Sequence, residues 1–229
     1  MLEVTDLHAG YGQSEALHGV SFTAHADQTV AIMGRNGMGK TTLFKTLMGV
    51  LPARSGRIAV RGEDVSREES FRRVAKGLAY VPQGRMIFPT LTVEENIQTG
   101  LEFSRTRRVP DEIYALFPVL HEMRRRRGGN LSGGQQQQLA IARALVTEPA
   151  VLLLDEPTEG IQPSIIKDIA RALNEIRRLR RITIVVSEQV LSFAMDVADR
   201  LIVIEGGRLV HESARGDTDV SRIRQYLSV

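Results

Sequence analysis

The stretch Gly34-Arg-Asn-Gly-Met-Gly-Lys-Thr-Thr42 decides the fold of this chain. It fits the pattern G-x-x-x-x-G-K-[ST], in which glycines let successive backbone N–H groups turn toward an anion where a Cβ would block the approach. The lysine adds a positive charge for the outer phosphates, and the hydroxyl after it suits a Mg²⁺ ligand. We expect a phosphate-binding loop made of Gly34, Arg35, Asn36, Gly37, Met38, Gly39, Lys40, Thr41 and Thr42.

The residues on either side of the loop favour this interpretation over a plain glycine-rich turn. Thr29–Met33 is an apolar run that predicts a buried strand, and Lys40–Met48 predicts a helix that ends at Gly49. The positive N-terminal end of that helix would face the phosphates. The chain is therefore expected to bind a nucleoside triphosphate.

Composition limits the remaining classes of protein. The chain has 229 residues, a net charge of +3 and no cysteine, which excludes disulfides and thiolate metal sites. No apolar run approaches the roughly 18 residues of a membrane span, and Met1–Asp6 lacks the features of a signal peptide, so a cytosolic protein is expected. The run Arg124–Arg127 has no interleaved aromatic residues for base stacking. Solvated helix ends explain it better than nucleic acid or anionic lipid, and no nucleic-acid partner is expected.

The order of the other segments predicts an α/β fold. Alternating residues at Leu2–Leu7, Val20–Thr23 and Arg57–Val60 predict an antiparallel sheet with one solvated face. Short apolar runs alternate with helical periodicity, which predicts a mostly parallel sheet with helices on both sides. The expected buried strands are 78–81, 151–154, 182–186 and 201–204, with a hairpin turn at 205–208; the expected helices are 111–126, 133–147, 164–180 and 189–199. Between residue 84 and about 148 the strand signal is absent, which predicts a helical lobe inserted into the core.

Two acidic residues follow the apolar run Val151–Leu154 and are expected at the carboxyl edge of the sheet, where α/β sheets bind ligands. Adjacent carboxylates repel each other, and each is costly to bury without a cation. A Mg²⁺ ion shared with the phosphates relieves both costs, so Asp155 is expected to hold the metal and Glu156 to orient and deprotonate the attacking water. A charged strand end that caps the next helix is the alternative.

A second glycine motif, Leu131-Ser-Gly-Gly-Gln135, opens the predicted helix 133–147. Ser132 and Gln135 form a capping box in this interpretation. The capping box leaves Gly133 and Gly134 unexplained, because glycine in the first turn weakens a helix. Exposed backbone at a helix N-terminus suits the close approach of an anion. Two copies of the chain placed head to tail would put Ser132 of each copy over the nucleotide of the other.

At this point the chain resembles the ATP-binding-cassette (ABC) ATPases over nearly its whole length. The resemblance implies a P-loop NTPase fold and one nucleotide-binding domain over residues 1–229. This domain would consist of a RecA-like α/β core at 1–83 and 149–229, with an antiparallel β edge, and of an inserted helical subdomain at 84–148 that carries L-S-G-G-Q. It also implies that Tyr11 stacks on adenine and that Gln83 approaches Mg²⁺ and the attacking water. ATP and Mg²⁺ are the implied cofactors. From the residues alone, Tyr11 could equally be a half-buried aromatic at a strand end, and Gln83 a turn residue after Pro82.

Two positions depart from the family pattern. Gln189 stands where the family usually has a histidine near the γ-phosphate, and Gln162 stands where an aspartate is usual. Gln189 can donate an amide hydrogen bond but cannot titrate, so the site needs no histidine proton. Glu156 is therefore expected to be the main base, with Lys40, Gln83 and Gln189 as the other catalytic residues.

The segments Tyr80–Arg85, Phe88–Asn96 and Glu159–Pro163 give a narrower resemblance, to the ATPase subunits of branched-chain amino acid importers and, through Gln83, to the urea importers among them. This resemblance implies import of urea or, alternatively, of branched-chain amino acids. The implied partners are a second ABC ATPase subunit, two membrane permease subunits that dock near Met86-Ile-Phe88, and an extracellular or periplasmic solute-binding protein, with the chain on the inner face of the cell membrane. An exporter ATPase remains open. A soluble cassette that acts on DNA or ribosomes and a non-enzymatic ATP-binding switch are disfavoured, since the chain has one cassette and intact Lys40, Asp155 and Glu156.

Overall fold

The computed structural model describes residues 1–103 and 108–228, and its larger sheet has six strands. Their order is β10 (Arg208–Ala214), β9 (Arg200–Glu205), β3 (Thr29–Met33), β8 (Thr183–Glu188), β7 (Val151–Asp155) and β6 (Leu78–Val81). All neighbouring strands are parallel except β10, which pairs antiparallel with β9 through the predicted turn at Gly206-Gly207. The expected mostly parallel sheet is confirmed.

A smaller antiparallel sheet lies beside the first one. It contains β2 (Ser14–Ala24), β1 (Leu2–Tyr11), β4 (Ser55–Val60) and β5 (Glu63–Asp64), in that order. β1 and β2 are longer than predicted, because their pairing continues past the core to Tyr11 and Ser14. Tyr11 is therefore the last residue of β1 and not a loop residue after it.

The six-stranded sheet is buried on both faces. One face packs with the small sheet and with α1 (Lys40–Met48), and Val30, Ile32 and Leu153 point into this core. The other face packs against α6 (Gly133–Leu145), α7 (Pro163–Arg180) and α8 (Leu191–Val197), and Met33 and Leu154 point into it. Burial on both sides explains why these strands are continuous apolar runs without polar alternation.

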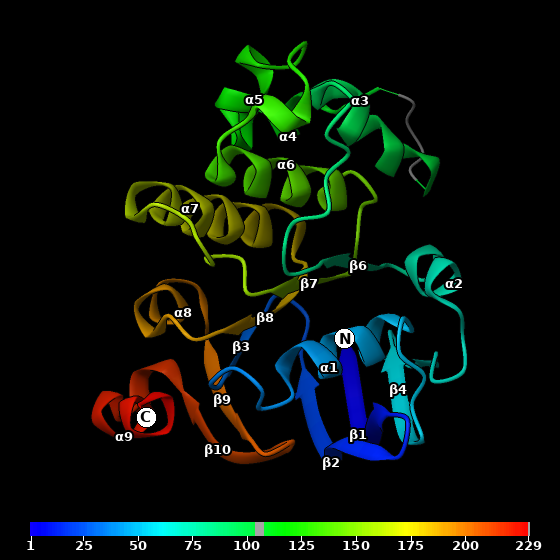
Figure 1. The fold of residues 1–229 in the computed structure, drawn as a ribbon, viewed down its shortest axis with the longest axis vertical. Helices are drawn as coiled ribbons and strands as arrows, with labels where there is room; N and C mark the ends of the chain where they lie inside the picture. The colour runs from blue at the N-terminus through cyan, green and yellow to red at the C-terminus, as the bar shows by residue number, and fades with distance from the viewer. Residues whose placement is uncertain (104–107, 229) are drawn as a thin grey trace.

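Between β6 and β7 the described residues form helices and loops and one isolated bridge, from Thr92 to Arg127. The helices are α3 (Val93–Gln98), η1 (Thr99–Phe103), α4 (Asp111–Leu116), α5 (Pro118–Glu122), η2 (Gly128–Asn130) and α6. Figure 1 shows them at one end of the molecule, with the antiparallel sheet at the other. The single helix expected at 111–126 is wrong: it breaks at Phe117, since Pro118 excludes its preceding residue from helical geometry and lacks an N–H. No helix in the described part of the chain has the length and apolar character that a bilayer span requires.

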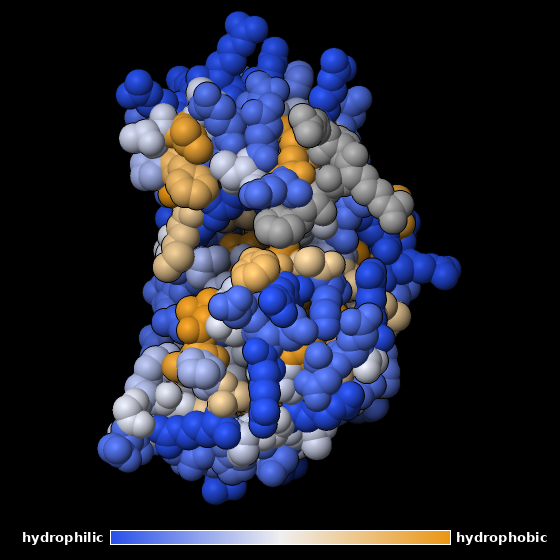
Figure 2. Space-filling model, turned by 90° about the vertical axis from the view of Figure 1, so that its right-hand side faces the viewer, coloured by the Kyte–Doolittle hydropathy of each residue, from blue (hydrophilic) through white to orange (hydrophobic). Residues whose placement is uncertain are grey.

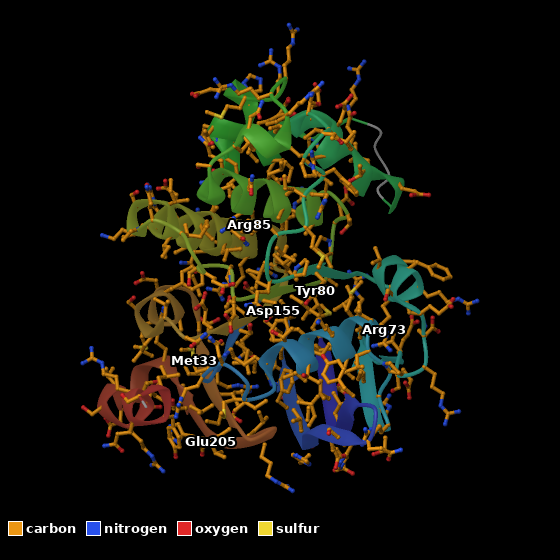
Figure 3. The ribbon with its side chains drawn as sticks, in the orientation of Figure 1. Met33, Arg73, Tyr80, Arg85, Asp155 and Glu205 are labelled. Atoms are coloured by element: carbon orange, nitrogen blue, oxygen red, sulfur yellow. The ribbon has the colours of Figure 1, made fainter. Side chains whose placement is uncertain are left out.

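Three further helices complete the described chain, namely α2 (Ser70–Ala75), η3 (Arg215–Asp217) and α9 (Val220–Leu227). Arg73 on α2 is only 2% exposed. Its guanidinium donates to the carbonyl oxygens of Thr46 and Leu47 at the C-terminal end of α1, and to those of Ser66 and Glu68. Burial lowers the pKa of Arg73. One side chain thus joins the end of α1, the 66–68 loop and α2, on the right of Figure 3.

The register of the parallel strands brings three loops to one edge of the sheet. Met33 at the end of β3 pairs with Glu188 at the end of β8, and Asp155 at the end of β7 pairs with Ser187. The loops that follow β3, β7 and β8 therefore start side by side at the carboxyl edge.

Candidate active site

The glycine loop between β3 and α1 has the geometry that its sequence predicts. Gly37 and Gly39 have φ angles of 81° and 107°, which disfavour any side chain. A Cβ at Gly34 would lie 2.6 Å from the carbonyl oxygen of Ile204. Gly39 is the N-cap of α1 and has no side chain to cap it, so no side-chain cap competes with an anion for the N–H groups of the first turn.

Lys40 lies at the base of this loop and is 3% exposed. Its Nζ donates to the carbonyl oxygens of Gly34 at 2.5 Å and Arg35 at 2.8 Å, and lies 3.0 Å from Oε1 of Glu156. The Glu156 side chain is also buried, with 7% of its surface exposed. An arriving phosphate offers the ammonium a second anionic partner, which leaves the Glu156 carboxylate available to accept a proton from water.

Asp155 ends β7 and is 1% exposed. Its carboxylate accepts hydrogen bonds from the hydroxyls of Ser187 at 2.6 Å, Tyr80 at 3.2 Å and Thr41 at 3.4 Å. Burial raises the pKa of Asp155, the three hydroxyls oppose that rise, and the neighbouring Glu156 adds to it. Figure 3 shows Tyr80 and Asp155 near the middle of the molecule.

The oxygen donors at this edge fit a Mg²⁺ ion that arrives with phosphates. Thr41 and Asp155 present hard oxygen ligands, and the buried Asp155 has no cationic side chain bonded to it among the described residues. Among all residues that the structure describes, no group of three or more His, Cys, Asp or Glu side chains is placed so that it could hold a metal. Because Mg²⁺ is commonly held by one or two carboxylates together with substrate phosphates, this donor set suits the ion.

A cavity of about 320 Å³ connects these groups. Its lining includes most of the predicted phosphate loop, Gln83 and Glu156: Ala16, Asn36, Gly37, Gly39, Lys40, Thr41, Thr42, Gln83 and Glu156. Tyr11 does not line it and is 50% exposed at the end of β1. The structure thus brings the loop, Glu156 and Gln83 together around one cavity, whereas Asp155 does not line it and is linked to it through the Thr41 hydroxyl.

The two glutamines make different contacts. Nε2 of Gln189 donates to Oδ1 of Asn36 at 2.7 Å and to the Glu156 carboxylate at 3.3 and 3.4 Å. Gln189 therefore lies between the phosphate loop and the expected base. Nε2 of Gln83 donates to Oε2 of Glu159 at 3.0 Å. Gln162 is the N-cap of α7 but makes no side-chain cap there.

One buried acid was missed by the sequence analysis. Glu188, 2% exposed, accepts hydrogen bonds from the backbone N–H and the hydroxyl of Thr158 and from the N–H groups of Gln189 and Val190. Burial raises its pKa, and these hydrogen bonds oppose the rise. Glu188 thereby joins the loop after β7 to the loop after β8. The available signal was an acidic residue at the end of an otherwise apolar strand, next to Gln189.

The second glycine motif lies on the helical segment and does not line the cavity. Ser132 caps α6, and both hydrogen bonds of the predicted capping box with Gln135 are present. Gly134 has a packing reason that the sequence did not reveal: a Cβ there would lie 2.7 Å from Cγ2 of Ile165 on α7. A Cβ on Gly133 would meet the guanidinium of Arg85 at 3.2 Å, the flexible end of a side chain.

At the end of the lid loop, which we define as residues 83–86, and just after it, the chain exposes apolar side chains. Met86 is 68% and Phe88 47% exposed, whereas Ile87 is partly buried and packs against the larger core. Two of the three residues at which the resemblance implies permease docking are therefore exposed. Both line a groove of about 350 Å³, the apolar groove, together with Met48, Val74, Ala79, Tyr80, Thr99, Gly100, Ala140, Arg143, Ala144 and Thr147.

The fold and the cavity define the class of P-loop nucleoside triphosphatases. Comparison with known families narrows this class, since residues 17–159 match the model of the ABC transporter family. The chain belongs to this family, the ATP-hydrolysing cassettes of ABC transporters.

Three relatives and one solved structure illustrate the similarity. The high-affinity branched-chain amino acid transport ATP-binding protein BraG of Pseudomonas aeruginosa is 41% identical over 92% of this chain and 91% of its own length. A probable branched-chain amino acid transport protein, LivF of Archaeoglobus fulgidus, is 34% identical over 91% and 90%. The lipopolysaccharide export protein LptB of Haemophilus influenzae is 31% identical over 97% and 96%. An ATP-binding subunit of an ABC transporter superposes with a TM-score of 0.85 at 25% identity, over 99% of both chains.

Proposed function

We propose that the chain is the ATP-hydrolysing subunit of an importer for branched-chain amino acids, on the inner face of the cell membrane. The observation that supports this cargo most directly is the similarity to two branched-chain amino acid transport ATPases over nine-tenths of the chain. Gln83 pointed to urea in the sequence, but none of the relatives described above is named for urea. The amino acid alternative is therefore preferred, and urea is retained as an outcome of the test.

The contacts of the cavity support a division of work among its residues. Lys40 and the loop N–H groups bind the outer phosphates, and Thr41, Asp155 and Gln83 would hold Mg²⁺. The ion would neutralise charge on the phosphates when bound. Glu156 orients and deprotonates the water, and Gln189 fixes the position of the Glu156 carboxylate relative to Asn36. Tyr11, at the margin of the site, would stack on adenine.

A second cassette would complete the site. Ser132, Gly133, Gly134 and Gln135 are absent from the cavity of their own chain, and Ser132 is exposed. In our proposal these residues cover the nucleotide of a partner cassette, which is either a second copy or a companion subunit. The helical subdomain, 84–148, would then present the motif to the partner, while the core at 1–83 and 149–229 binds its own nucleotide.

The apolar groove is proposed as the docking site of a permease subunit. Figure 2 shows this face with apolar side chains gathered at mid-height between hydrophilic parts. The groove is lined by residues of α1, α2, β6 and α6, so an inserted helix would contact both the core and the helical segment. Arg143 lies 5.3 Å from the ring centre of Phe88 and would border an apolar occupant with a positive charge. A solute-binding protein would act through the permeases.

Reconstitution with the two membrane permease subunits of such an importer tests the proposal. Vesicles that contain the complex should take up labelled leucine when ATP is supplied on the cassette side. Uptake of labelled urea in place of leucine would select the other cargo, and outward transport would refute the importer assignment.

A docking variant refines the same experiment. Phe88→Glu should abolish uptake and leave the ATPase activity of the isolated subunit unchanged, because the groove lies outside the cavity. Leu179→Glu is the matched control, since Leu179 on α7 is 56% exposed and lines neither the groove nor the cavity. Equal uptake by both variants would exclude this groove as the docking site.

A further inference from the structure

The side chain of Gln83 is held by a residue that the family pattern did not single out. Its Nε2 donates to Oε2 of Glu159, and the two atoms are 3.0 Å apart. Glu159 lies in the loop after β7, three residues beyond the expected base Glu156. An ionised carboxylate only accepts hydrogen bonds, so it can bind only the NH₂ end of an amide. The contact therefore leaves the carbonyl oxygen of Gln83 as the end that remains for other ligands.

The backbone of Glu159 is fixed separately from its side chain. Nη2 of Arg85 donates to the Glu159 carbonyl oxygen at 3.2 Å. Figure 3 shows Arg85 above Asp155, toward α6 and α7. On the other side of the lid loop, Arg143 donates to the carbonyl oxygen of Met86 at 2.8 Å. Because these contacts use backbone carbonyls, truncating the Glu159 side chain should leave both loops in place.

The lid loop itself is held in an uncommon conformation. Gly84, Arg85 and Met86 have φ angles of 80°, 69° and 46°, so three successive residues are left-handed. Non-glycine residues take this conformation at an energetic cost and keep it only where the surroundings impose it. The backbone next to Gln83 is thus held by contacts on both sides of the loop, and Glu159 supplies the hydrogen bond at the Gln83 amide.

We propose that Glu159 is a positioning residue that orients the Gln83 amide with its carbonyl oxygen available to the metal and water side of the cavity. Gln83 already lines that cavity beside Thr41 and Glu156. A free glutamine amide could turn either end toward the cavity, and its NH₂ end cannot bind a cation. Glu159 removes that ambiguity. The inference rests on the proposed role of Gln83 and does not depend on the transported cargo.

A double-mutant cycle tests the inference. Wild type, Glu159→Ala, Gln83→Ala and the double variant are each prepared with Glu156→Gln, so that bound ATP persists. The affinity of each ATP complex for Mn²⁺ is then measured by electron paramagnetic resonance. Glu159→Ala should weaken Mn²⁺ binding about three- to tenfold, as expected for losing one solvent-exposed hydrogen bond. In the Gln83→Ala background it should have no further effect.

Two variants make the result specific. Glu159→Gln can still accept the hydrogen bond through its own carbonyl oxygen, so it should restore the affinity to within about twofold of wild type. Glu175→Ala removes an exposed carboxylate on α7 outside the cavity and should change nothing. In the chains with an intact Glu156, the Mg²⁺ concentration for half-maximal turnover should rise for Glu159→Ala, while the KM for ATP at saturating Mg²⁺ stays near wild type.

The outcomes separate this inference from the proposed role of Gln83. An equal loss from Glu159→Ala in both backgrounds, or no loss in either, would overturn the positioning role. If Gln83→Ala alone leaves Mn²⁺ affinity unchanged, Gln83 is not a metal ligand, and the role of Glu159 is overturned with it. The importer assignment would survive both results, because uptake is measured separately.

Discussion

The phosphate cavity and the Ser132–Gln135 motif both contain the glycines that predict anion binding, but the structure holds the two regions in different ways. In the cavity, Lys40, Glu156 and Gln189 are bonded to one another or to the loop before any nucleotide is present. At the motif, the capping box completes the local hydrogen bonds, and Gly133 lies next to the flexible end of the Arg85 side chain. One region is preorganised within a single chain, whereas the other, in our proposal, acts on the nucleotide of a partner cassette.

The largest effect should come from the preorganised region. Glu156→Gln keeps the size of the side chain but cannot accept a proton, so turnover should fall by about 10² to 10⁴. ATP binding should be retained, because the phosphate loop is unchanged. Phosphate release and equilibrium nucleotide binding measure the two properties. Wild-type hydrolysis by this variant would show that Glu156 is not the base.

A pair of alanine variants tests the motif. Gly134→Ala should destabilise the fold by about 1–3 kcal/mol, because the new methyl group overlaps Ile165. Gly133→Ala meets only the end of the Arg85 side chain and should leave the free energy of unfolding nearly unchanged. Denaturant unfolding measures both.

Turnover of the same variants then separates packing from partner contact. Gly133→Ala should lower ATP hydrolysis although the protein remains stable, since the methyl group would displace the Arg85 guanidinium at the surface that, in our proposal, covers the nucleotide of the partner. Full turnover by Gly133→Ala would mean that the two regions do not meet in the working enzyme.

Gln189 tests how much of the preorganisation matters for the reaction. Gln189→Leu is similar in size but loses the hydrogen bonds to Asn36 and Glu156, so kcat should fall about tenfold with little change in KM. Steady-state kinetics measure the split. A change confined to KM would assign Gln189 to nucleotide binding instead.

The smallest effect concerns the hairpin that carries Tyr11 and borders the cavity. Nδ1 of His8 lies 2.7 Å from Oε1 of Glu15; this contact raises the pKa of His8 from 6.5 and lowers that of Glu15 from 4.5. Because the pKa of His8 is raised on folding, its contribution to stability is fully present below pH 6.5 and is lost as the pH rises through the folded pKa. Because the pKa of Glu15 is lowered, its contribution is present above pH 4.5 and is lost as the pH falls through the folded pKa.

Near pH 6, the melting temperature of the wild type should therefore exceed that of His8→Gln by at most about 2 °C. This difference should vanish by about pH 9. Thermal unfolding followed by circular dichroism measures it. A difference that grows with pH would contradict the assigned sign.

The sequence predicted the elements that bury apolar runs and the left-handed glycines of the loop before Lys40. The helix Lys40–Met48 and the strand that ends at Asp155 lie where expected, because their signals are local. Short helices such as α2 and α3 were not predicted, since six residues carry too little periodicity and their stability comes from tertiary packing.

Parts of the site depend on contacts between distant segments, and these could not be read from the chain. Glu159 meets Gln83 across 76 positions, and Glu188 meets Thr158 across 30. Nothing in the local pattern marks such pairs. Gly134 shows the converse: its motif was recognised, but the reason for one of its glycines is Ile165, on another helix.

The buried guanidinium of Arg73 sets a limit on how this protein can move. A lysine could not serve its four acceptors, because it has three donors and no planar fork. The C-terminal end of α1 and one wall of the apolar groove, at Val74 on α2, are consequently joined by one buried side chain. If a docked permease helix displaces that wall, we expect α1 to translate or rotate as a whole. Bending between α1 and α2 should not absorb the displacement.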